Sequence, residues 1–150
     1  MDDTDRKILR ELQRDGRQTI QELSERAGLS PSPCLRRVRN LEKAGIISGY
    51  AAIVDQEAYG LPVTVFLQVK LSPHTEQTVA AFEQAVARID EIMECYLMAG
   101  DRDYLVKVVV ASLADYEDFM RRRVHKLPGI ASLESSFAFG VIKQSQVLPG

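Results

Sequence analysis

The sequence contains few of the residues that build metal sites and disulfide frameworks. Tryptophan is absent, and the 150 residues include only two cysteines and two histidines. Cys34 and Cys95 lie far apart, whereas zinc and redox motifs use closely spaced thiols or pairs of thiol and imidazole. We therefore expect no metal, no cofactor and no disulfide, and we expect both cysteines to be small buried side chains in a reducing compartment.

Long apolar runs and targeting signals are missing as well. No uninterrupted apolar run approaches the roughly 20 residues that span a bilayer. The first five residues are acidic and lack the basic and apolar regions of a signal peptide. Hydrophobic residues make up 45% of the chain and charged residues 27%, which suits one globular domain or two small ones. We expect a cytoplasmic protein that has no membrane partner.

The groups that enzymes use are also scarce. The sequence has no evident nucleophile–base pair, no glycine-rich loop for phosphates and no cluster of histidines or cysteines. The carboxylates of the stretch "DRD" at 101–103 are the only candidates. We expect no catalytic residues.

The first 50 residues predict three helices. Apolar residues at helical spacing indicate a helix over residues 4–15, capped by Thr4 or Asp5. Thr19 and Glu22 form a capping box for a short second helix that ends at Gly28. A third helix follows over 30–44. Two helices joined by a tight glycine turn are typical of a helix-turn-helix motif.

Beyond Gly45 the pattern changes to that of strands. Residues 46–54 are β-branched and interrupted by glycine, which predicts a short hairpin or strand serving as a wing. The predicted domains are a helix-turn-helix over 1–50, a strand and linker over 51–62, and a second domain over 63–150.

The second half predicts alternating strands and helices. The expected order is a strand at 63–71, a helix at 75–88, strands at 92–98 and 104–111, a helix at 112–125, and a strand at 130–142. This βαββαβ order is the ferredoxin-like arrangement, so the fold class is α+β. Both helices cover one face of such a sheet, and we expect dimerisation through the other face.

The third helix carries a basic face. Residues 1–50 hold ten Lys and Arg against eight Asp and Glu, whereas residues 51–150 hold nine against thirteen. At about 100° per residue, one side of the helix gathers polar residues opposite Cys34, Val38 and Leu41. These polar residues are Ser32, Arg36, Arg39, Asn40 and Lys43.

Two interpretations of this face compete. An Arg-rich outer face is most often merely solvated. Here a capped helix and a glycine turn precede it, and a predicted wing follows it. Arg can bind guanine and Asn can bind adenine in the major groove, while Lys and Arg bind phosphates. The residues alone therefore favour contact with double-stranded DNA.

The sequence resembles the Lrp/AsnC family of bacterial and archaeal transcription regulators over essentially its whole length. The similarity is carried by "DRKILRELQRDGR", "ELSERAGLSPSPCLRRVRNLEKAGII", "ECYLMAGDRDYLVKV" and "KLPGIASLESSFAFGVIK". The resemblance implies that residues 1–50 are a winged helix-turn-helix that binds DNA. It implies that residues 63–150 are a βαββαβ ligand-response and oligomerisation domain that responds to amino acids. It also implies homodimers that assemble further, often into octamers.

The resemblance also assigns site residues. It makes residues 30–44 the recognition helix, so the predicted DNA contacts are Ser30, Ser32, Arg36, Arg37, Arg39, Asn40 and Lys43, with Gln18 and Thr19 touching phosphate. It places the amino acid effector at the glycine-acid turn, with Leu97, Met98, Gly100, Asp101, Asp103, Tyr104, Ser136 and Phe137. Arg102 stands where many relatives carry an aromatic or small residue.

The chemistry of these residues suits an amino acid zwitterion. Asp101 or Asp103 can pair with the ammonium, and turn amides can receive the carboxylate. Alternatively, Asp and Gly serve only the geometry of a tight turn. A regulator modulated by an amino acid is the favoured function, and a DNA-compacting architectural protein without an effector is the alternative.

Overall fold

The computed structural model describes residues 1–149, which fold into two compact units. The first unit runs from Met1 to Ile53 and resumes at Ile142, and the second is Val54–Val141. This grouping differs from the predicted division, which left everything after residue 62 in the second domain.

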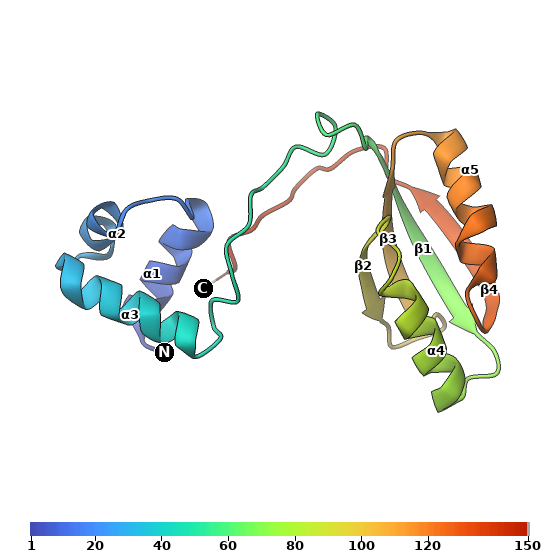
Figure 1. The fold of residues 1–150 in the computed structure, drawn as a ribbon, viewed down its shortest axis with the longest axis horizontal. Helices are drawn as coiled ribbons and strands as arrows, with labels where there is room; N and C mark the ends of the chain where they lie inside the picture. Colours follow the sequence, from blue (N-terminus) through green and yellow to red (C-terminus); the bar gives the residue numbers. More distant parts are fainter. Residues whose placement is uncertain (150) are drawn as a thin grey trace. The chain divides into compact units, whose positions relative to one another are not determined.

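The first unit contains three helices, α1 (Asp3–Arg14), α2 (Ile20–Ala27) and α3 (Pro31–Lys43) (Figure 1). Asp2 caps α1, not Thr4 or Asp5 as expected, because its side chain accepts a hydrogen bond from the Asp5 backbone N–H. Thr19 and Glu22 form the predicted capping box of α2. The two prolines of α3 lie in its first turn, where backbone donors have no intrahelical acceptor.

A small apolar core holds these helices together. Ile8, Leu23, Cys34 and Val38 are buried in it. Gly28 ends α2 in the left-handed conformation, with φ 72°, and the next amide bonds back to the carbonyl of Ser24 at 2.8 Å. This turn, which favours glycine, sets the direction in which α3 leaves α2.

The segment after α3 differs from the expectation. Residues 46–54 form no strand in the described structure, so the predicted hairpin is wrong here. Ile53 and Val54 are exposed, and without a partner strand the extended backbone has no ladder to join. The chain returns to this unit at its other end, where the Leu148 amide donates to Oε1 of Gln13 at 2.8 Å.

The second unit is a four-stranded antiparallel sheet with two helices. Its elements are β1 (Val63–Leu71), α4 (Glu76–Val86), β2 (Ile92–Leu97), β3 (Tyr104–Val110), α5 (Leu113–Arg122), a 3-10 turn (Val124–Lys126) and β4 (Ile130–Phe137). The strand order is β2-β3-β1-β4, the split βαββαβ arrangement that the sequence predicted (Figure 1). Strand β4 ends at Phe137, five residues before the predicted end.

The core lies on one face of the sheet. Val65, Leu67 and Val69 of β1 pair with Val108, Val106 and Tyr104 of β3, and Phe82 of α4 and Phe119 of α5 pack in the same cluster. The opposite face is mixed, since Phe66 and Leu105 share it with Lys107 and the other polar residues of the central strands. Cys95 is exposed, which corrects the expectation that both cysteines are buried.

Candidate DNA-binding face and effector region

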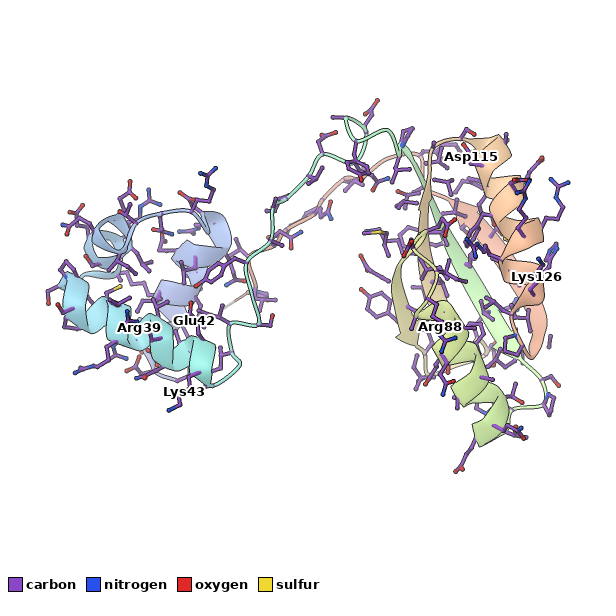
Figure 2. The ribbon with its side chains drawn as sticks, viewed as in Figure 1. Arg39, Glu42, Lys43, Arg88, Asp115 and Lys126 are labelled. Atoms are coloured by element: carbon purple, nitrogen blue, oxygen red, sulfur yellow. The ribbon has the colours of Figure 1, made fainter. Side chains whose placement is uncertain are left out.

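The outer face of α3 presents its polar side chains to solvent. Cys34, Val38 and Leu41 are buried on the inner side, and the residues predicted to contact DNA there are exposed, namely Ser32, Arg36, Arg39, Asn40 and Lys43. Figure 2 shows Arg39 and Lys43 on this helix. The helix therefore offers three cations and an amide on one accessible side.

The start of α3 is held by its backbone. Ser30 is the N-cap, but its side chain makes no capping hydrogen bond, and its carbonyl accepts from the Cys34 amide at 3.2 Å. Burial raises the pKa of the Cys34 thiol, so the thiol stays neutral at physiological pH. Cys34 is thus a packing residue under the helix.

Arg37 lies apart from the other arginines. Its Nη1 atom is 2.8 Å from Oδ2 of Asp2 and 2.7 Å from Oδ1 of Asp5, at the N-terminus of α1. On a helical wheel it stands about 100° from Arg36, at the flank of the exposed face. The resemblance grouped Arg37 with the DNA contacts. Nothing in the sequence indicated its link to these acids, because they lie more than thirty residues away in the chain.

Gln18 and Thr19 are already engaged within the first unit. The Gln18 amide donates to the carbonyls of Glu11 and Asp15, both at 2.8 Å, at the end of α1. The Thr19 hydroxyl accepts from the Glu22 amide and donates to the Glu22 carboxylate. Their predicted contacts with phosphate stay predictions, and the structure gives each a role in ending or starting a helix.

The sequence did not indicate a link between α3 and the segment that follows it. The Tyr50 hydroxyl donates to Oε1 of Glu42 at 3.0 Å. Burial and the neighbouring carboxylate raise the pKa of Tyr50. Glu42, the one acid of α3, is labelled in Figure 2, and this bond occupies its carboxylate.

In the second unit, four predicted effector residues are exposed around the turn between β2 and β3. Leu97 is 70% exposed and Met98 43%. Gly100 has φ 142°, in the region that favours glycine, and Asp101 is exposed beside it. The Met98 amide closes the turn by donating to the carbonyl of Asp103 at 2.8 Å.

The side chains of Asp103 and Tyr104 instead form hydrogen bonds within the second unit. The Asp103 carboxylate accepts from the Leu71 amide at 2.7 Å, and its other oxygen is 3.5 Å from Nε2 of His74. Tyr104 is buried and donates to Glu83 of α4. Of the two predicted ammonium partners, Asp101 is the one whose side chain lies exposed at the turn.

Ser136 and Phe137 point to opposite faces of the sheet. Phe137 pairs with Val65, whose side chain is in the core, and Ser136 pairs with Phe66 on the other face. The Phe137 ring lies edge-on to Tyr116 of α5, with centroids 5.0 Å apart. Arg102 reaches β4, donating to Ser132 at 2.8 Å and Glu134 at 3.2 Å.

The described part of the chain, residues 1–149, holds no group of three or more His, Cys, Asp or Glu side chains placed to bind a metal. None of its helices is both long enough and apolar enough to cross a membrane.

Both units match known families. Residues 1–48 match the winged helix-turn-helix DNA-binding family, and residues 64–148 match the Lrp/AsnC ligand binding domain. The chain belongs to the Lrp/AsnC family. It is therefore a DNA-binding transcriptional regulator with a ligand-binding domain, and the predicted family and fold class are confirmed.

Relatives of this Lrp/AsnC regulator match along nearly its whole length. The leucine-responsive regulatory protein of Escherichia coli K12 is 39% identical over 148 residues, covering 99% of this chain and 90% of that protein. An AsnC family regulator of Agrobacterium tumefaciens has a TM-score of 0.95 at 38% identity, covering 99% and 97% of the two chains. A Neisseria meningitidis regulator in complex with L-Met has a TM-score of 0.94 at 36% identity, covering 99% and 96%.

Proposed function

We propose that this regulator reads DNA sequence through the exposed face of α3 and that an amino acid bound to its second unit modulates this binding. It acts in the cytoplasm, on the nucleoid, and performs no catalysis. The exposed set of Arg36, Arg39, Asn40 and Lys43 on one side of α3 carries the first part of this proposal.

The chemistry of that face suits the major groove. Arg36 and Arg39 can bind guanine or phosphate, and Asn40 can pair with adenine. Ser32 and Lys43 lie on the same side, near its two ends. The other predicted contacts lie outside this set: Ser30 is the N-cap of α3, Arg37 lies at the flank of the face, and Gln18 and Thr19 precede α2. Any contact that these four residues make with DNA is secondary in the proposal.

The effector is an amino acid, as in the L-Met complex of the Neisseria regulator. We place it at the turn after β2, where Asp101 faces the ammonium, exposed amides around Gly100 face the carboxylate, and Leu97 and Met98 border the side chain. Asp103 and Tyr104 support this turn from inside. Ser136 and Phe137 pair with Phe66 and Val65, away from the turn, and lie on opposite faces of the sheet, so they stay predictions without a place at this turn.

The functional form is a homodimer that assembles further, to an octamer. The open face of the sheet supports a contact between copies because Phe66 and Leu105 lie in its two central strands. A dimer would place two copies of α3 on half-sites about one helical turn apart.

DNA binding is tested by fluorescence anisotropy with the regulator's own upstream DNA and with random DNA of equal length. At one stated salt concentration we expect tighter binding to the former by about 10³-fold or more. The double variant Arg36→Ala/Arg39→Ala should lose this preference, whereas Arg6→Ala, an exposed arginine of α1, should keep it. Equal affinity for both DNAs would instead identify an architectural protein.

The effector is tested by thermal unfolding of the full chain with each of the twenty amino acids. A ligand present at 100 times its Kd stabilises the folded state by about 2.7 kcal/mol, so a true effector raises the melting temperature measurably. A flat response at millimolar concentration of all twenty would contradict the effector.

A further inference from the structure

The carboxylates of Asp2 and Asp5 each use their two oxygens for two different partners. Oδ1 of Asp2 accepts from the Asp5 amide at 2.8 Å, and Oδ2 of Asp5 accepts from the Asp2 amide at 3.0 Å. The remaining oxygens, Oδ2 of Asp2 and Oδ1 of Asp5, both accept from Nη1 of Arg37. The capping box of α1 is thereby joined to the middle of α3 through one guanidinium nitrogen.

We propose that Arg37 is a positioning residue for DNA recognition: it fixes the direction of α3 against the first turn of α1, and it does not contact DNA. The inference deepens the proposed function, because it assumes that the exposed face of α3 reads DNA. It removes Arg37 from the predicted contacts and adds Asp2 and Asp5 as determinants of affinity.

The geometry supports this assignment in three ways. Both hydrogens of Nη1 are directed to carboxylates, so the end of the side chain is oriented toward α1. Arg37 is half-buried, whereas Arg36 and Arg39 are exposed. Asp5 is also largely shielded, with 15% of its side chain exposed, and a carboxylate shielded in this way needs its cation.

The contact of Arg37 with Asp2 and Asp5 also restrains the orientation of α3. The start of α3 has no side-chain cap, and its contacts with α1 and α2 are otherwise apolar and non-directional. A charge-assisted bond to two fixed carboxylates is directional, and it restrains rotation of α3 about its own axis. Such a rotation would move Arg36, Arg39 and Asn40 together relative to the groove.

The experiment measures DNA affinity of the full chain against salt concentration for Arg37→Met and Asp5→Asn. Arg36→Met is the matched control for the first, since it removes the same charge one residue earlier. Asp3→Asn is the control for the second, since Asp3 is an exposed acid of the same turn that does not contact Arg37. All measurements are made well below each variant's melting temperature.

If Arg37 positions α3, Arg37→Met and Asp5→Asn both weaken binding, by roughly threefold or more, and leave the slope of log K against log salt unchanged. Arg36→Met removes a cation from the DNA-contacting side and reduces the magnitude of that slope, by about 0.9 where Arg36 contacts a phosphate. Asp3→Asn does not weaken binding, because removing an acid near DNA reduces repulsion. Weakening by Asp5→Asn is the decisive result, since simple electrostatics predicts the opposite.

The inference is overturned if Arg37→Met lowers the slope as Arg36→Met does. It is also overturned if Asp5→Asn strengthens binding by freeing the guanidinium, or leaves it unchanged. If the wild-type chain binds no DNA, the proposed function fails. In that case a double-mutant cycle on thermal unfolding still tests the contact between Arg37 and Asp5. If the losses of stability caused by Asp5→Asn and Arg37→Met are additive, the two residues are not coupled and the inference is contradicted.

Discussion

The hydroxyl of Tyr104 donates a 2.7 Å hydrogen bond to the carboxylate of Glu83, joining β3 to α4. The tyrosine ring lies 4.7 Å, centroid to centroid, from that of Phe82, and only 2% of Tyr104 is exposed. Burial, and then the neighbouring Glu83 carboxylate, raise the pKa of Tyr104 above its ordinary value of 10. Tyr104 is therefore a neutral donor that holds the second unit together.

Replacing Tyr104 by Phe should lower the free energy of unfolding by about 0.5–1.5 kcal/mol, because one hydrogen bond is lost while the ring stays. Glu83 is exposed and can be hydrated, which limits the cost. Urea unfolding at neutral pH measures the change. Tyr59→Phe, at an exposed tyrosine of the same unit, is the control and should have no effect.

The same residue gives a pH dependence in the alkaline range. A folded-state pKa above the unfolded one means that the folded chain keeps a proton that the unfolded chain loses. The stabilisation is complete below pH 10 and decreases as pH rises above 10. Unfolding measured across this range should show a loss of stability that is smaller in Tyr104→Phe. If the free energy of unfolding falls equally steeply with pH in the wild type and in Tyr104→Phe, the raised pKa of Tyr104 is contradicted.

Gly129 should tolerate no side chain. Its φ is 75°, and a Cβ there would lie 2.1 Å from Cγ2 of Thr78. We expect Gly129→Ala to lower stability by about 1–2 kcal/mol for backbone strain and by a further 1–3 kcal/mol for the overlap. Gly60→Ala is the control, because Gly60 also has positive φ but has open space around it.

Thr78→Ser removes the methyl group that the new Cβ would strike. In the Gly129→Ala background it should therefore restore part of the lost melting temperature. If Thr78→Ser restores none of the melting temperature, the loss of stability in Gly129→Ala comes from the strained φ alone and not from the overlap with Thr78.

Acid should weaken the first unit through Asp2. The backbone hydrogen bond from Asp5, and then the bond from Arg37, hold the pKa of Asp2 below its ordinary value of 3.8. The stabilisation is thus present above pH 3.8 and is lost as pH falls through the lower folded-state value. Asp2→Asn should flatten the stability curve below pH 4, as followed by far-UV circular dichroism, whereas Asp3→Asn should not.

Asp101 and Asp103 should separate into two roles. Asp103→Asn should lower the melting temperature of the free protein, since Asp103 accepts from the Leu71 amide and lies near His74. Asp101→Asn should leave that temperature unchanged and reduce the rise produced by an amino acid effector. Thermal unfolding with and without the effector distinguishes the two, and the reverse pattern would contradict the proposed site.

Local features were predictable because their causes lie within a few residues. Thr19 and Glu22, or Ser112 and Asp115, form caps at a spacing of three that any reader of the sequence can find. The buried side of α3 followed from its periodicity alone. The links of Arg37 to Asp2 and Asp5 could not be predicted, since only the packing of α1 on α3 brings them together.

The orientation of the predicted effector residues on β4 could have been foreseen from the sequence. Adjacent residues of a strand face opposite sides, so Ser136 and Phe137 were to be expected on opposite faces of the sheet, as the strand pairing has them. The burial of Tyr104 was also indicated by its alternation with Val106 and Val108. The missing wing strand is a different case, since residues 46–54 have strand-like composition but no neighbouring strand in the structure with which to pair.

The bond between Gln13 and Leu148 joins residues 135 positions apart. In topological terms, the sheet unit is an insertion within the helical one, whose chain is interrupted after Ile53 and resumed at Ile142. During synthesis the three helices emerge first, whereas the contact between Gln13 and Leu148 forms only after the sheet unit has been made. A fragment that ends at residue 53 is thus a helix-turn-helix without the hydrogen bond between Leu148 and Gln13. A fragment that ends at residue 141 lacks the same hydrogen bond.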